Sequence, residues 1–142
     1  MFLLHLVIEE SKVIKVNRLL HSTILVSDFS QAIDFYEGLL NFKMDHQRPD
    51  LGFAGRWYSL GEQQVHLMVL PDPEKKQNVQ IDRPEHAGRD RHIAFEVDSV
   101  ENLAKLLESN NIKFTMSRSG RKALFCRDPD GNGLEFVQFD LV

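Results

Sequence analysis

The chain has 142 residues, 42% of them hydrophobic, and a formal net charge of -4. This size and composition predict one globular domain with its own hydrophobic core. The basic residues are scattered, which argues against the concentrated positive surface of a nucleic-acid-binding protein. The single cysteine, Cys126, excludes an internal disulfide and favours a reducing compartment. We expect Cys126 to be a small buried side chain and not a nucleophile.

The first residues form a short apolar run, Met1–Ile8. This run lacks the basic start of a signal peptide and is followed at once by Glu9 and Glu10. It is also too short to span a bilayer. We interpret residues 1–16 as an N-terminal extension that packs on a partner as an added strand or helix. We therefore expect a cytoplasmic protein without membrane association.

The first half of the remaining chain is predicted to form a strand, a helix and three more strands. Residues 19–26 are apolar and β-branched, as in a strand. Ser27 and Asp28 are typical N-cap residues for a helix over 30–40, where apolar side chains recur at helical spacing. The further strands are expected at 42–48, 56–60 and 63–70. The last two strands are joined by a tight turn at Gly61-Glu62.

The second half repeats this order. Residues 91–97 are expected to form a strand, and Asp98 and Ser99 are cap residues for an amphipathic helix over 100–109. The further strands are expected at 112–118, 121–126 and 134–139. The sequence therefore predicts two copies of a βαβββ module. The modules are about 17–70 and 88–140, joined by an exposed, proline-containing linker at 71–87, within one domain over 17–142.

Four side chains of the types that bind metals occupy equivalent positions in the two halves. Superposing the halves places His21 on His92 and His66 on Glu135. Strand alternation puts these side chains on the face away from the helices. A pseudo-twofold axis would bring both pairs to one centre. Three imidazoles and a carboxylate suit zinc, nickel, cobalt or iron. Four protein ligands on an octahedral ion leave two positions open, and these suit a substrate with neighbouring oxygens.

The chain resembles the vicinal oxygen chelate superfamily in three stretches. These are LLHSTILVSDFSQAIDFYEGLLNF, the histidine strand RHIAFEV, and DPDGNGLEF. The resemblance covers roughly Asn17–Phe139. It implies an α+β fold in which two βαβββ modules form an open, cup-shaped mixed sheet with helices on the outside. Members include glyoxalase I, methylmalonyl-CoA epimerase, extradiol dioxygenases, fosfomycin-resistance thiol transferases and metal-free bleomycin-binding proteins.

The resemblance also implies roles for the paired residues. His21, His92 and Glu135 match the ligand positions of metal-dependent members, whereas His66 stands where glyoxalase I has a glutamate. The superfamily pairs modules within one chain or between two chains. The resemblance, together with the apolar N-terminal run, therefore leads us to expect a homodimer, and it leaves open whether the site lies within one chain or is shared between two.

Two further residues are candidates for substrate binding. A two-residue turn at Gly61-Glu62 would place Trp57 opposite His66, where its ring packs either on substrate or in the sheet's own core. Arg121 lies in the second half's hairpin. Resemblance to the thiol transferases favours a position facing the cavity, where it would hold a carboxylate or phosphate, and the alternative is an ordinary exposed arginine.

These observations lead to one main hypothesis and two alternatives. The main hypothesis is a lyase or isomerase that uses nickel, cobalt or zinc on a small oxygenated substrate, with Glu135 shuttling a proton. The first alternative is an extradiol-type dioxygenase with Fe(II) on His21, His92 and Glu135, and with His66 as an acid or base; manganese also fits such a site. The second is a binding protein that sequesters a drug or toxin without turnover.

Overall fold

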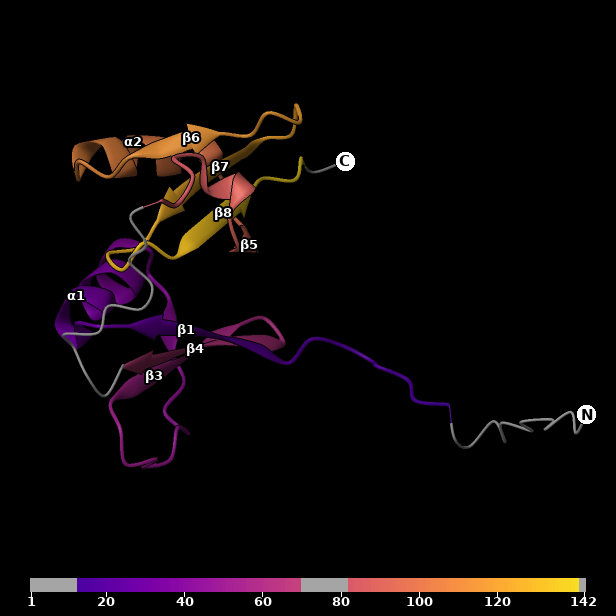
Figure 1. Ribbon diagram of the computed structural model, residues 1–142, viewed down its shortest axis with the longest axis vertical. Helices are drawn as coiled ribbons and strands as arrows, with labels where there is room; N and C mark the ends of the chain where they lie inside the picture. Colours follow the sequence, from indigo (N-terminus) through magenta and orange to yellow (C-terminus); the bar gives the residue numbers. More distant parts are fainter. Residues whose placement is uncertain (1–12, 70–81, 141–142) are drawn as a thin grey trace, which may run out of the picture.

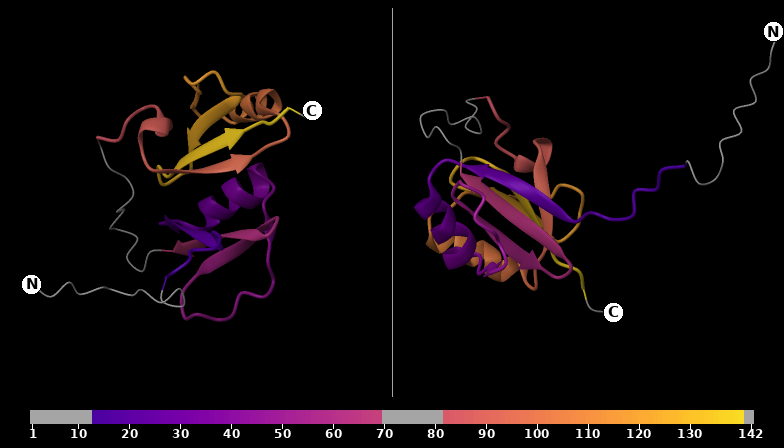
Figure 2. Two further views of the ribbon diagram at one scale, coloured as in Figure 1. Left: turned by 90° about the vertical axis from the view of Figure 1, so that its right-hand side faces the viewer. Right: turned by 90° about the horizontal axis from the view of Figure 1, so that it is seen from below.

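The computed structural model describes residues 13–69 and 82–140. Most of the predicted N-terminal extension and of the linker lies outside these residues. The described start of the chain, 13–20, runs away from the body without regular secondary structure (Figure 2). Its apolar side chains are exposed, Val16 at 92%. Within the described parts, no helix is long and apolar enough to cross a membrane.

The first module is a four-stranded mixed sheet with a helical segment on one face (Figure 1). It consists of β1 (His21–Val26), α1 (Phe29–Ile33), the π-helix η2 (Asp34–Leu39), β2 (Lys43–Met44), β3 (Gly55–Leu60) and β4 (Gln63–Val69). The strand order is β1-β4-β3-β2, with β1 parallel to β4 and the other pairs antiparallel. Asp28 caps α1 by accepting a hydrogen bond from the Gln31 amide at 2.9 Å. The predicted helix is confirmed, although apolar spacing gave no sign that its second half is a π-helix.

The second module repeats this arrangement. It consists of the short 3₁₀ helix η3 (Ala87–Arg89), then β5 (His92–Glu96), α2 (Val100–Ser109), β6 (Phe114–Met116), β7 (Ala123–Arg127) and β8 (Gly133–Val137). Its strand order, β5-β8-β7-β6, matches that of the first sheet. The registers also match, because His66 lies opposite Thr23 and Glu135 lies opposite Ala94. The predicted repeat of two βαβββ modules in an open α+β fold is confirmed.

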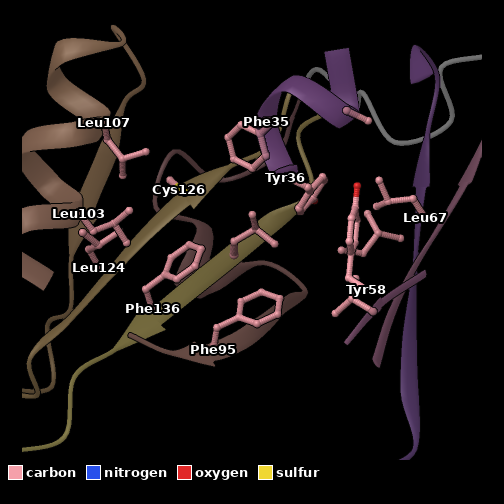
Figure 3. Packing of buried hydrophobic residues seen from close by; sticks show 14 of the residues in the cluster. Phe35, Tyr36, Tyr58, Leu67, Phe95, Leu103, Leu107, Leu124, Cys126 and Phe136 are labelled. Atoms are coloured by element: carbon pink, nitrogen blue, oxygen red, sulfur yellow. The ribbon is translucent and has the colours of Figure 1, made fainter. Parts of the chain in front are cut away.

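The helix-bearing faces of both modules contribute to one hydrophobic core (Figure 3). Ile24 and Val26 in β1 and Phe95 in β5 are buried, as strand alternation predicts. The Phe42 and Phe95 rings meet across the two modules, with centroids 5.4 Å apart. Cys126 belongs to this core, and burial raises the pKa of its thiol to about 12, as expected for an unreactive cysteine.

A buried polar cluster also joins the modules. The Tyr36 hydroxyl donates to the Asp128 carboxylate at 2.7 Å, and the Asn132 amide donates to the same oxygen at 2.8 Å. Asp130 accepts from the hydroxyl and the amide of Ser27. Burial and the neighbouring Asp128 raise the pKa of Tyr36 well above its usual value, so this hydroxyl keeps its proton and acts as a donor. The DPDGN turn therefore fastens the second module to η2 and to the connection between β1 and α1 of the first.

The end of the predicted linker is not exposed, so that part of the prediction is wrong. His86 and Ala87 are buried, at 9% and 2% exposure. The His86 ring packs edge-on against Phe125, with centroids 4.7 Å apart, and its Nδ1 is hydrogen-bonded to the Thr115 hydroxyl. Proline and polar composition suggested a solvated segment, whereas these two side chains cover part of the second sheet.

Candidate metal centre

His92 and Glu135 form a close pair on the second sheet. The His92 Nε2 lies 3.2 Å from Glu135 Oε2. His92 begins β5, and Glu135 lies in the neighbouring strand β8, where its side chain is 5% exposed. The pair results from sheet register, because Glu135 is opposite Ala94 and therefore shares the sheet face of His92.

The hydrogen bonding of His92 fixes the direction of its ring, with Nε2 facing Glu135. Its Nδ1 lies 2.8 Å from the Asp90 carbonyl, which can only accept, so Nδ1 carries a proton. A neutral ring in this tautomer would turn the lone pair of Nε2 towards an acceptor oxygen, and a proton or a cation between the two atoms would relieve that repulsion. Two ligand atoms bound at about 2.1 Å to one ion lie about 3.0–3.4 Å apart for octahedral to tetrahedral angles. The observed 3.2 Å fits that range.

Arg121 also contacts this pair. Its Nη2 donates to Glu135 Oε1 at 2.7 Å, while the arginine side chain stays 57% exposed. Each oxygen of the Glu135 carboxylate therefore has a partner, one cationic and one imidazole. This places Arg121 at the candidate site. Arg121 comes two residues before Ala123, the first residue of β7, and Phe125 of this strand lies opposite Glu135.

His21 and His66 form the equivalent pair on the first sheet, in a different geometry. Their rings stack with centroids 4.1 Å apart and planes 13° from parallel. Trp57 lies opposite His66, as the tight turn predicted, and stacks on the other side of its ring at 4.4 Å. The nitrogen lone pairs of two stacked rings lie in nearly parallel planes, so they do not converge on one point. To share an ion with His21, His66 would have to turn out of this stack.

A hydrogen-bond chain that the sequence gave no reason to single out holds His66 in place. The His66 Nε2 lies 2.8 Å from Gln64 Oε1, and the Gln64 amide donates to Asp45 at 2.6 Å. Since an amide oxygen only accepts, Nε2 of His66 is the donor. Burial and the neighbouring His21 lower the pKa of His66. Gln64 lies two residues before His66 and so shares its sheet face. This spacing is the one feature of the sequence that could have indicated that Gln64 contacts His66.

The two pairs do not meet within one chain. They lie on the outer faces of two separate sheets whose other faces share the core. Among the described residues, no three histidine, cysteine, aspartate or glutamate side chains gather closely enough to hold a metal. The four-ligand site expected from the repeat therefore stays a prediction.

The repeated βαβββ fold is that of the glyoxalase-like proteins. The chain belongs to the Glyoxalase/Bleomycin resistance protein/Dioxygenase superfamily, whose family model matches residues 18–136. It is 28% identical over 128 residues to "Glyoxylase I 4" of Arabidopsis thaliana, covering 84% of this chain and 70% of that protein. It is 25% identical over 128 residues to lactoylglutathione lyase of Escherichia coli O157:H7, covering 85% and 92%.

Solved structures agree on the fold. A glyoxalase family protein from Bacillus anthracis aligns with a TM-score of 0.69 and 18% identity, covering 90% of this chain and 99% of that one. TnmS3, an antibiotic binding protein from Streptomyces sp. CB03234, aligns with a TM-score of 0.64 and 16% identity, covering 90% and 100%. The likeness therefore extends to proteins named as enzymes and to one named as a binder. It shows family membership and leaves the activity to be argued from the site.

Proposed function

We propose that the protein is a homodimeric, divalent-metal-dependent lyase or isomerase of the glyoxalase type, acting on a small substrate with neighbouring oxygens. In this proposal His21 and His66 of one chain and His92 and Glu135 of a second copy hold one metal. The homodimer then carries two such sites, related by symmetry.

The separation of the two half-sites is the observation that supports this proposal. Each sheet presents one pair of ligand-type side chains on the face that the shared core leaves free. Bringing both pairs together within one chain would require separating the modules, and Tyr36–Asp128 and Phe42–Phe95 hold the modules together. A second chain can supply the missing half without breaking these contacts.

The chain's own residues account for the remaining roles. The metal, when bound, supplies Lewis-acid polarisation of substrate oxygens. Glu135 is the candidate for holding and moving the substrate proton, because its Oε2 already faces a group that takes a proton or cation. Arg121 neutralises this carboxylate, and its exposed guanidinium is free to contact an anionic part of the substrate. Trp57 offers a flat apolar surface beside His66.

A subunit-mixing experiment tests the shared site. His21→Ala and His92→Ala chains carry different affinity tags, are unfolded and refolded together, and the doubly tagged dimer is isolated and loaded with Ni²⁺. Each variant alone should bind little metal, because every site in its homodimer lacks one ligand. The mixed dimer has one site lacking both histidines and one intact site, so it should bind one Ni²⁺ per dimer by elemental analysis.

The control is His46→Ala, which removes an exposed histidine outside both pairs. It should bind two Ni²⁺ per dimer, as the unmodified protein should. A mixed dimer that stays metal-free would contradict the shared site, and so would stoichiometric metal in a monomer.

One observation favours a second candidate, an extradiol-type Fe(II) dioxygenase. His66 is engaged with Gln64 and stacked on Trp57, which leaves His21, His92 and Glu135 as a two-histidine, one-carboxylate set. In this candidate His66 is an acid or base beside the metal. The His66→Ala variant separates the two. The four-ligand site predicts at least about a tenfold loss of metal affinity, whereas the three-ligand site predicts intact metal content with reduced turnover.

A further inference from the structure

We propose that the second module carries an additional ligand site, separate from the candidate metal centre, for a small molecule with an apolar body and a carboxylate or phosphate group. The site is the cavity between residues 83–87 and the β6–β7 end of the second sheet. None of the four candidate metal ligands lines it.

The cavity has a volume of about 430 Å³, enough for a small organic molecule. Apolar side chains form most of its wall, among them Ala87, Ile112, Phe114 and Phe125. Three basic residues also line it, namely Arg83, Lys113 and Arg127. The one acidic residue among the lining residues, Glu85, is exposed. An apolar wall with a few polar groups is the usual composition of a small-molecule site.

Arg83 provides the main evidence for a ligand. Its side chain is only 8% exposed. Its Nη1 donates to the Gly131 carbonyl, and its Nε lies 3.4 Å from Asp90 Oδ2 in an ion pair that forms no hydrogen bond. Within the described parts of the chain, the buried Nη2 has no partner. A buried guanidinium nitrogen without an acceptor is costly, and a ligand oxygen would supply one.

The balance of buried charge favours an anion. Arg83 and Arg127 both contact the single carboxylate of Asp90, with Arg127 Nη1 at 2.8 Å. The side chains of Arg127 and Asp90 are also largely buried, at 22% and 16% exposure. Two largely buried cations therefore share one buried anion. A ligand carboxylate or phosphate would compensate the remaining charge and would accept a hydrogen bond from Nη2 of Arg83.

The experiment compares ligands that differ in one feature. Hexanoate, hexyl phosphate, hexanol and inorganic phosphate are titrated into the ¹⁵N-labelled protein, and amide shifts are followed at Ala87, Thr115 and Arg127. At least one of the two hexyl anions should bind about tenfold or more tightly than hexanol, because hydrogen bonds to a charged group are strong. The tighter of the two identifies the acid group. The bound anion should also raise the melting temperature.

Arg83→Met tests the residue itself. It keeps the length and apolar stem of the side chain and removes the buried charge, so we expect it to stay folded. It should weaken binding of the anion by about tenfold or more, while Arg118→Met, which removes an exposed arginine outside the cavity, should not. If Arg83→Met fails to fold, the comparison of hexyl anions with hexanol in the unmodified protein still decides the matter. Equal binding of hexanol, or of inorganic phosphate and hexyl phosphate, overturns the proposal.

Discussion

The Tyr36→Phe variant isolates the polar contact between the modules. The substitution removes one hydroxyl from a fully buried ring and leaves Asp128 without the donor at 2.7 Å. The same carboxylate oxygen keeps one donor, Asn132 at 2.8 Å. A hydrogen bond to a charged group contributes about 1.5–3 kcal/mol, so we expect the free energy of unfolding in urea to fall by roughly that amount near pH 7.

The effect should depend on pH, with a definite sign. Burial raises the pKa of Asp128, so its contribution to folding is present at low pH and is lost as pH rises through the raised pKa. The hydrogen bond from Tyr36 opposes this rise. Tyr36→Phe raises the pKa of Asp128 further, so the destabilisation should be smaller near about pH 4 than near about pH 7.

Tyr58→Phe is the matched control. Tyr58 is equally buried, but its hydroxyl lies 3.1 Å from Glu37, whose carboxylate also receives Arg56 and is 27% exposed. Water can replace the lost donor there, so the cost should be nearer about 1 kcal/mol. If Tyr36→Phe costs no more than Tyr58→Phe at neutral pH, or if its cost is the same at both pH values, the account of the inter-module contact is refuted.

Three further predictions concern the oligomeric state, the effect of metal on stability and the cap of α2. Light scattering at micromolar concentration should give the mass of a homodimer, and a monomer would contradict the shared site. Removing metal from a sample that contains it stoichiometrically should lower the melting temperature, and metal affinity should fall as pH drops through about 6.5, where protons compete for the imidazoles. Ser99→Ala removes the N-cap of α2, whose hydroxyl accepts from the Asn102 amide at 3.1 Å, and should cost about 1 kcal/mol in urea unfolding.

Most of the architecture could be predicted from the sequence because the repeat carries the same information twice. The caps at Asp28 and Ser99, the hairpin at Gly61-Glu62 and the alternation around His21 and His92 all correspond to observed elements. These signals are local, since each depends on residues within a few positions of one another.

The rest depends on contacts between distant residues. The contact of His86 with Phe125, the hydrogen bond from Tyr36 to Asp128 and the hydrogen bond from Arg83 to Gly131 join residues far apart in the sequence, which no spacing rule connects. The repeat alignment showed which ligand types are equivalent, but it did not show that the two sheets turn these faces outward. The outward direction depends on which faces of the two sheets pack together. The alternation of side chains along each strand is the same whichever faces pack, so it cannot predict this.

The single core has a consequence for how such a chain arises. A lone βαβββ unit would expose the face that, in this protein, the other unit covers with Phe95, Phe136 and Leu124. Two identical units meeting through the same face would have satisfied each other as a symmetric pair. In one chain the two units can differ, and they do: His66 corresponds to Glu135, and the aspartate-rich DPDGN turn occurs in the second unit only. The divergence of the two halves, more than their similarity, is what gave the protein two chemically distinct surfaces.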